Sequence, residues 1–582
     1  MTRRACARQQ GVAIRIRQLF PFLQWPRPTA LSLRQDAFAG ISVGLVLIPQ
    51  AIAYATLAGM PPQTGLYAAL LPSLVGMLWG SSALLAVGPV ALTSLLTFGS
   101  LAPLAAPGTP QWVTLAIWLA LYAGAIQFLL GAFRLGRIAH LVSQPVVTGF
   151  IHAAALIIIL SQLPALFGIT LSLPGLGALA SGAIDMTILA TTAVGGGALV
   201  LLLLLKRCAP RLPGMLIVTL LGIAVSRLFD YKGAGGAIVG NVPAGLSPLA
   251  LPFAIPLESH QALWPAALIL ALVSFTEAMS SCRVLARKQG ARWDENQELI
   301  GQGMAKVTSG LCGAFPVSGS FSRSALNLYA GATSAWSTLF SALCVLLCLL
   351  FLTDFLYYLP QPVLAAMIIV PVFGLLDWRA FRRLFLISRD EGMVAVVTFV
   401  VTLCATPQLQ WGVFAGVALT MVSYLYRRAH PRLIEVGLHD DGTLRDRQRF
   451  GMARLAPDLL AVRLDAALNF LTAAIVERFI VDHLRADPAI RRVLLCAGGI
   501  NDIDVSGVEA LEVLHNTLHE QGVTLHVSAL KKQVSDVLER AGVLALLGPE
   551  RLFATELQAL EGLSVIPGQA NLGIEKKKLN ST

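Results

Sequence analysis

The chain of 582 residues is poor in charge: 56% of its residues are hydrophobic and only 13% are charged, whereas soluble domains carry roughly 25% charged residues. This composition excludes an ordinary soluble enzyme. The formal net charge of +11 does not indicate nucleic-acid binding, because much of the basic excess lies in short connections between apolar runs, where membrane topology explains it.

The composition changes once along the chain. A membrane-spanning helix needs ~20 mainly apolar residues, and such runs follow one another from Asp36 to about Arg428. After about Arg432 charged and apolar residues alternate over short segments, as in a soluble domain. We therefore predict a basic cytoplasmic segment at 1–35, a transmembrane domain at 36–430, a soluble domain at 431–565 and a polar tail at 566–582.

Basic residues fall on alternate connections between the apolar runs, and basic connections favour the cytoplasm. They are the N-terminal segment, Arg134 with Arg137, Lys206 with Arg207 and Arg211, 283–292, 379–389, and Arg427 with Arg428. The Gly- and Pro-rich connection 230–261 suits the outside. This pattern predicts about fourteen crossings of a bacterial inner membrane, with both termini in the cytoplasm. No cleaved signal peptide is expected, because the Arg-rich start lacks a short apolar region with a cleavage site.

The sequence offers no arrangement typical of an enzyme. The eight cysteines are scattered, and none forms a CxxC pair or lies at metal-ligand spacing from histidines. The soluble part contains neither a phosphate-binding Walker loop nor a dinucleotide fingerprint. We therefore predict no catalytic residues, no cofactor and no metal site.

Two apolar segments are interrupted at corresponding places in the two halves of the membrane part. The breaks fall at Gly88 and Pro89 within 84–101, and at Pro316 and Gly319 within 313–331. Paired Gly/Pro interruptions of this kind mark the substrate site of transporters built as inverted repeats. They predict two half-helices whose N-termini meet near the membrane centre. The alternative is that these residues only kink packed helices.

Two opposed helix N-termini favour an anion, because each presents free N–H groups and a partial positive charge. Arg323 adds a fixed charge that an oxyanion can meet with two parallel hydrogen bonds. Small residues beside the breaks let a ligand approach the backbone. The substrate-binding candidates here are Val90, Ala91, Ser320, Phe321, Ser322 and Arg323.

Charged side chains within apolar runs are costly, and each is therefore a functional candidate. Besides Arg323 they are Glu277 and Lys306. Glu277 is a candidate for binding a coupling cation or proton, together with Ser281 one turn later. The alternative is that Glu277 is a structural partner for Lys306 or Arg323.

Gln50 and Tyr54 lie one turn apart, next to Pro49. They are candidates for lining the same cavity. Packing alone explains them almost as well.

The soluble part alternates strand and helix patterns, which indicates a small α/β sheet domain. Strands are predicted at 459–464, 492–497 and 523–529, and helices at 471–485, from about 506, and at 531–541. Ser506 is a candidate N-cap, where a phosphate would meet free N–H groups. Capping alone is the alternative to phosphorylation.

These motifs together resemble the SulP family of sulfate permeases, which carry a C-terminal STAS domain (sulfate transporter and anti-sigma factor antagonist). The resemblance covers the chain from about Asp36 to Leu563. It is carried by GLVLIPQAIAYATLAGMPPQTGLYAALLP, GSSALLAVGPVALTSLL, GQGMAKVTSGLCGAFPVSGSFSRSALNLYAG and DIDVSGVEAL.

The resemblance implies seven plus seven segments in inverted repeat, a core module that moves against a gate module, and commonly a homodimer. It implies an anion held between the third and tenth segments, lined by the residues matching Gln50, Tyr54, Val90, Ser322 and Arg323. It matches Glu277 and Ser281 to a cation site of sodium-coupled relatives. Ser506 matches the serine that is phosphorylated in soluble STAS proteins.

The sequence motif SGSFSRSALN is most similar to that of sulfate carriers, so sulfate uptake by secondary active transport is the expected function. Lys306 stands where the family pattern has asparagine. Its ammonium could reach toward Glu277 and replace a bound cation, which favours proton symport over sodium coupling. The alternatives are a bicarbonate or dicarboxylate transporter or exchanger, an anion channel, and a membrane-anchored scaffold whose STAS domain binds a cytoplasmic partner.

Overall fold

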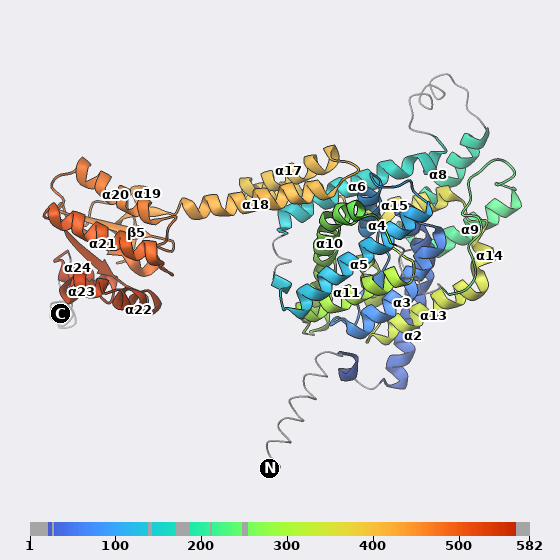
Figure 1. Ribbon diagram of the computed structural model, residues 1–582, viewed down its shortest axis with the longest axis horizontal. Helices are drawn as coiled ribbons and strands as arrows, with labels where there is room; N and C mark the ends of the chain where they lie inside the picture. The colour runs from blue at the N-terminus through green and yellow to red at the C-terminus, as the bar shows by residue number, and fades with distance from the viewer. Residues whose placement is uncertain are drawn as a thin grey trace, which may run out of the picture. The chain divides into compact units, whose positions relative to one another are not determined.

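The computed structural model describes residues 21–25, 28–137, 142–169, 186–209, 212–246, 254–290 and 292–565. Part of the predicted segment 1–35 and all of the predicted tail 566–582 lie outside these residues. The chain forms two compact units, Met1–Thr420 and Met421–Thr582 (Figure 1).

The first unit consists of helical segments in two successive sets of seven. The first set is α2 (Ala30–Leu57), α3 (Pro62–Trp79), β1 (Ala86–Gly88) with α4 (Ala91–Leu101), α5 (Pro110–Ala132), α6 (Gln144–Phe167), α8 (Met186–Cys208) and α9 (Gly214–Leu228). The second set is α10 (Leu257–Gln289), α11 (Glu295–Leu311), β2 (Ser318–Ser320) with α12 (Phe321–Tyr329), α13 (Trp336–Leu347) continued by a π-helical stretch (Cys348–Leu352) and α14 (Thr353–Leu356), α15 (Gln361–Phe373), α17 (Arg389–Cys404) and α18 (Gln410–Ala429). A short helix, α16 (Trp378–Ile387), joins α15 to α17, and a 3₁₀ turn (Pro21–Gln24) precedes α2.

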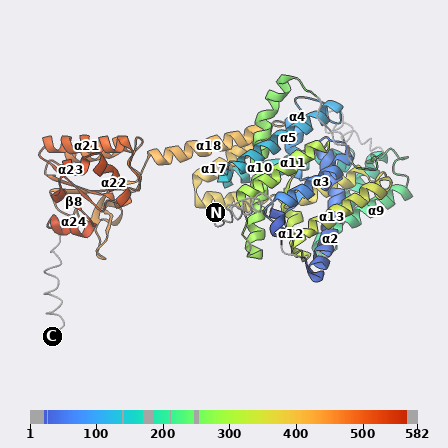
Figure 2. The same ribbon diagram turned by 60° about the horizontal axis from the view of Figure 1, so that its bottom comes forward.

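This architecture confirms the predicted number of segments and the two interrupted ones. Within the described residues, seven helices are long and apolar enough to cross a membrane. The sets are mixed in space: α11 packs against α3 and α5, and α13 packs against α2 (Figure 1, Figure 2). The prediction of an all-helical unit missed the strands β1 and β2, which are three residues long each.

Helices α5 and α11 cross at glycines. A Cβ atom on Gly124 would lie 2.8 Å from the backbone oxygen of Gly303, and one on Gly303 would lie 2.5 Å from the backbone nitrogen of Phe128. Only glycines allow two helix backbones to approach this closely. Gln127 and Lys306 each follow one of these glycines by three residues, and the crossing therefore brings their side chains together.

Replacing Gly303 with valine is expected to destabilise the first unit by about 1–3 kcal/mol, the usual cost of forcing extra carbon atoms into a packed core. The midpoint of thermal unfolding and the yield of monodisperse protein should both fall, as measured by heating followed by size-exclusion chromatography. Gly197→Val in α8 is the control, because a Cβ atom there would meet nothing within 4 Å. Equal losses in the two variants would contradict the contact argument.

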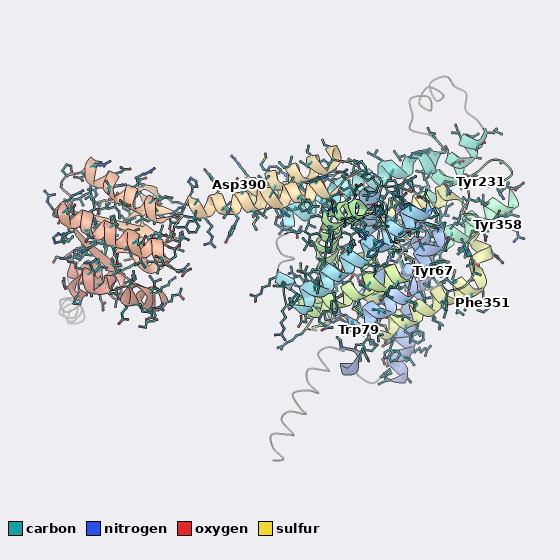
Figure 3. The ribbon with its side chains drawn as sticks, viewed as in Figure 1. Tyr67, Trp79, Tyr231, Phe351, Tyr358 and Asp390 are labelled. Carbon is teal, nitrogen blue, oxygen red and sulfur yellow. The ribbon has the colours of Figure 1, made fainter. Side chains whose placement is uncertain are left out.

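Residues at two of the connections that are predicted to lie on opposite membrane faces lie on opposite sides of the first unit (Figure 3). Asp390 directly follows the basic stretch 379–389, and Tyr231 belongs to the connection 230–261. Figure 3 labels both residues, with Asp390 at one side of the unit and Tyr231 with Tyr358 at the other. The topology and the orientation of the unit in a membrane stay predictions.

The second unit is an α/β domain around one six-stranded sheet with strand order β4-β3-β5-β6-β7-β8. Strands β5 to β8 are parallel, and β3 pairs antiparallel with both β4 and β5. The strands are β3 (Leu433–Leu438), β4 (Leu444–Asp446), β5 (Leu459–Leu464), β6 (Arg492–Cys496), β7 (Thr524–Ser528) and β8 (Leu552–Phe553). The helices are α19 (Arg447–Phe450), α20 (Ala473–Ala486), α21 (Val505–Glu520), α22 (Lys532–Arg540), α23 (Val543–Leu547) and α24 (Glu556–Gly562), with 3₁₀ turns at Ala497–Gly499 and Pro549–Arg551.

The three predicted strands and three predicted helices of this domain are confirmed as β5 to β7 and α20 to α22. Their apolar faces form a common core that includes Val462, Leu495 and Leu525 of the sheet. Strands β3, β4 and β8 were not predicted. β3 carries a charge, Glu435, in the middle of a six-residue segment, and β4 and β8 are only three and two residues long.

Candidate functional site

The two interrupted segments meet as a short antiparallel ribbon. Ala86 pairs with Ser320, Val87 with Gly319 and Gly88 with Ser318. β2 runs directly into α12, and Pro89 and Val90 join β1 to α4. Because the strands are antiparallel, the chain enters the two helices in opposite directions, and both helices begin beside the same ribbon.

Neighbouring side chains satisfy polar groups of the ribbon. The Ser73 hydroxyl donates to the carbonyl oxygen of Val87 at 2.7 Å, and the Ala86 amide donates to the Ser324 hydroxyl at 2.9 Å. All four residues are buried. A buried backbone group without a partner is costly, so these contacts fix where the two helices begin.

Arg323 projects from the first turn of α12 toward the start of α4. Its side chain is only 2% exposed. Its Nη1 donates to the carbonyl oxygen of Pro89 at 2.8 Å, and its Nη2 lies 3.3 Å from the position that a Cβ atom would take on Gly88. Its Nε and Nη2 atoms are buried and have no hydrogen-bond partner. Two N–H donors of a buried guanidinium are therefore open beside the ribbon.

The starts of the two helices differ in their capping. Val90 is the N-cap of α4 and forms no side-chain hydrogen bond to the first turn. Ser320 is the N-cap of α12, and its hydroxyl accepts from the amide of Arg323 at 3.4 Å. Val90, Ala91 and Ser320 are buried. Phe321, which is 50% exposed, and Ser322 are the exposed residues at the start of α12.

Helix α2 contributes the predicted Gln50 and Tyr54, and it packs against both α4 and α12. Gln50 is 2% exposed and Tyr54 is 5% exposed. The Gln50 Oε1 atom is buried without a hydrogen-bond partner. Tyr54 lies near Arg323. The structure thus brings α2 to the region where α4 and α12 begin.

Glu277 of α10 lies near both cationic side chains of the unit interior. Its charge interacts with Arg323 and, more weakly, with Lys306. Its Oε2 atom is buried without a hydrogen-bond partner. Ser281, one turn later, is buried and donates its hydroxyl to the backbone oxygen of Glu277 at 3.2 Å. This bond orients the Ser281 hydroxyl toward its own helix.

Lys306 is fully buried, and its direct partner is Gln127. The Lys306 Nζ donates to the Gln127 Oε1 at 2.9 Å. The Gln127 amide in turn donates to the Ala271 carbonyl oxygen and to the Ser274 hydroxyl, at 2.6 and 3.1 Å. Among the residues that the structure describes, no ion pair within 4.0 Å joins Lys306 to Glu277. The predicted reach of the ammonium toward Glu277 is therefore electrostatic and involves no direct contact.

Ser506 is not an N-cap, and that prediction is wrong. Asp504 caps α21, because its Oδ1 atom accepts from the amide of Gly507 at 2.9 Å. Ser506 lies within the first helical turn and is partly exposed. Aspartate and serine cap helices equally well, and the sequence DIDVSG contains both. Phosphorylation of Ser506 stays a prediction.

A cavity of about 330 Å³ lies between α2, α4, α6 and the connection from α17 to α18. Its polar lining consists of neutral side chains, including Thr56, Ser161 and Gln162. Leu95, Phe98 and Gly99 of α4 also line it. Helix α4 therefore begins at the ribbon and lines this cavity with its C-terminal half.

Several polar residues of the site were missing from the sequence-based set. They are Ser73, Gln127, Ser274, Ser324 and Asn327. Their common feature is a position in or beside an apolar run, but hydroxyl and amide side chains are common there. The exception is Gln127, which is fully buried in the structure. Its amide lies in a 23-residue apolar helix, and this isolated polar residue could have been noticed in the sequence.

Comparison with known proteins identifies the family of each part of the chain. Residues 33–398 match the sulfate permease family and residues 452–559 match the STAS domain. A probable sulfate transporter of Mycobacterium tuberculosis is 33% identical over 531 residues, which cover 90% of this chain and 94% of that protein.

Two solved structures show the same fold. The murine Solute Carrier 26 family member A9 anion transporter, in its inward-facing state, superposes with a TM-score of 0.84 at 22% identity, covering 94% of each chain. The transmembrane domain of a cyanobacterial bicarbonate transporter superposes with a TM-score of 0.59 at 21% identity, covering 67% of this chain and 99% of that one. The paired half-helices and the α/β domain agree with the two family matches. The chain therefore belongs to the sulfate permease family of membrane anion transporters, with a C-terminal STAS domain.

Proposed function

We propose that the protein takes up sulfate across a bacterial inner membrane by secondary active transport coupled to protons. The substrate binds at the ribbon between α4 and α12. The observation that carries this proposal is the pair of unpartnered N–H donors on buried Arg323.

A buried guanidinium with open donors is unfavourable unless a ligand satisfies them. An oxyanion does so well, because two of its oxygens match two N–H groups of one guanidinium. The uncapped first turn of α4 supplies further N–H groups and a partial positive charge. Gln50, whose Oε1 is an acceptor without a partner, can turn its amide group toward the same ligand.

The charges of the site support proton coupling. When Arg323 and Lys306 are positively charged and Glu277 is negatively charged, the three side chains together carry a net charge of +1. Protonation of Glu277 raises this charge to two, which matches the two negative charges of sulfate. Sulfate and a proton therefore each favour binding of the other, which is the linkage that a symporter requires.

Sodium coupling is less well supported by the same residues. A bound sodium ion would add a cation close to Glu277, where the fixed ammonium of Lys306 already interacts electrostatically. Like charges in a poorly solvated interior repel strongly. Ser281, the second predicted ligand, donates its hydroxyl to the backbone of its own helix.

The test is uptake of labelled sulfate by proteoliposomes under controlled ion gradients. We expect an inward proton gradient to drive accumulation, and a sodium gradient to have no effect. Unlabelled sulfate should compete far better than bicarbonate or a dicarboxylate, and the reverse order would assign the site to one of those anions.

The same vesicles distinguish a carrier from other classes. Voltage-driven single-channel currents carried by sulfate would identify a channel, and an absence of all anion flux would leave a scaffold for STAS-domain partners. Buried Arg323 and Lys306 argue against a scaffold, because charged residues in a membrane interior are costly and a scaffold gains nothing from them. A homodimer and a cytoplasmic STAS partner remain part of the proposal.

A further inference from the structure

Helix α16 presents a row of arginines on one face. Arg379, Arg382 and Arg383 are spaced three and four residues apart, so they project from neighbouring positions on the helix surface. All three are exposed. Within the described part of the chain, none of them forms an ion pair with an acidic residue. Their positive charge is therefore available to a partner outside the chain.

Two aromatic residues of α16, Trp378 and Phe381, hold the helix against α6 and α17. The His152 ring of α6 lies 5.7 Å from the Trp378 ring and 4.9 Å from the Phe381 ring, and Phe381 lies 5.9 Å from Phe399 of α17, measured between centroids. The Nε2 atom of His152 accepts from the amide of Asp377 at 2.9 Å, directly before α16 begins. The helix is thus anchored at its start, and the direction of its arginine face is fixed.

Large apolar side chains flank the arginines and are uncovered. Trp378 is 57% exposed, Leu386 is 77% exposed and Ile387 is 68% exposed. No residue of α16 is buried. A short helix with exposed apolar flanks and a basic face is typical of a helix that lies in the plane of a membrane interface.

A fourth basic residue, from another helix, lies close to the turn before α16. The Nζ atom of Lys206, at the end of α8, is 3.9 Å from the position that a Cβ atom would take on Gly374, in the turn before α16. Lys206 is exposed, and so are Leu203 and Leu204 on the same helix end. The end of α8 therefore adds a basic group and exposed apolar side chains near the turn that leads into α16.

We propose that α16, with Lys206, is a binding site for anionic phospholipid, whose phosphate groups pair with the arginines while its acyl chains cover Trp378, Leu386 and Ile387. Charge complementarity selects an anionic headgroup, and the exposed apolar side chains select a lipid over a soluble anion. The site is separate from the ribbon where the transported anion binds. A lipid bound here contacts a helix fixed to α6 and α17.

The test counts phospholipids bound to the purified full chain by native mass spectrometry in equal amounts of phosphatidylglycerol and phosphatidylcholine. Each arginine near an anionic surface is worth about fivefold in binding. We expect the parent protein to prefer phosphatidylglycerol by about a hundredfold at this site, the product of three such factors. The variant R379Q/R382Q/R383Q should bind the two lipids equally, and R379K/R382K/R383K should keep most of the preference.

The matched control is R478Q/R485Q/R540Q, which removes the same charge from exposed positions of the STAS domain. It should keep the full preference. An unchanged preference in R379Q/R382Q/R383Q, or an equal loss in the control, overturns the proposal. If the triple variant does not fold, the single variant R382Q decides, since it should lose about fivefold in preference.

Discussion

Replacing Arg323 with glutamine is expected to weaken sulfate uptake at limiting substrate by at least about a hundredfold. Each hydrogen bond to a charged group is worth about 1.5–3 kcal/mol, and Arg323 has two N–H donors free for the ligand. Their joint loss, at least about 3 kcal/mol, corresponds to at least about two orders of magnitude in affinity. Initial rates of labelled sulfate uptake in proteoliposomes, measured over a range of sulfate concentrations, give the change.

Two further variants separate the possible causes of such a loss. Arg323→Lys keeps the charge but not the planar fork, so we expect an intermediate defect of about tenfold. Arg283→Gln removes one charge at the end of α10, where the side chain is 46% exposed and pairs with Glu295 at 3.5 Å, and it should transport normally. Because Arg323 also holds the Pro89 carbonyl, thermal stability is measured in parallel. A stable Arg323→Gln protein with the parent rate would rule out this site.

The parts of the fold that the sequence predicted are those determined by local patterns. Polar connections separate the long apolar runs that form the fourteen segments, and glycine and proline close together in mid-run favour a break in the helix. The strands β5 and β6 are short apolar runs between polar turns, and their boundaries were placed within one residue. Each of these signals is contained in a stretch of about twenty residues or fewer.

The parts that were missed depend on contacts between distant segments. The ribbon pairs Ala86 with Ser320, and nothing near either residue in the sequence specifies that partner. Likewise Lys306 was matched to Glu277 by charge alone, whereas the glycine crossing of α5 and α11 places it on Gln127. The cap of α21 was missed for a different reason, because two residues of equal capping ability stand two positions apart.

Replacing Glu277 with glutamine is expected to abolish proton-driven accumulation of sulfate and to leave sulfate–sulfate exchange intact. In the parent protein, acidification protonates Glu277 and raises the site charge, so uptake increases as the external pH falls. Glutamine is neutral at every pH and fixes the site in the state that binds sulfate, so uptake should no longer vary with pH. Internal acidification on sulfate addition, followed with a pH-sensitive dye inside the vesicles, should disappear.

Glu258→Gln is the matched control, because Glu258 lies on the same helix, α10, and is exposed in its first turn. It should retain both pH-dependent uptake and internal acidification. The distinction between binding and coupling matters here: a residue that only stabilised the fold would reduce exchange and accumulation together. If Glu277→Gln still moves protons with sulfate, Glu277 is not the coupling residue, and its interaction with Arg323 and Lys306 serves only to balance buried charge.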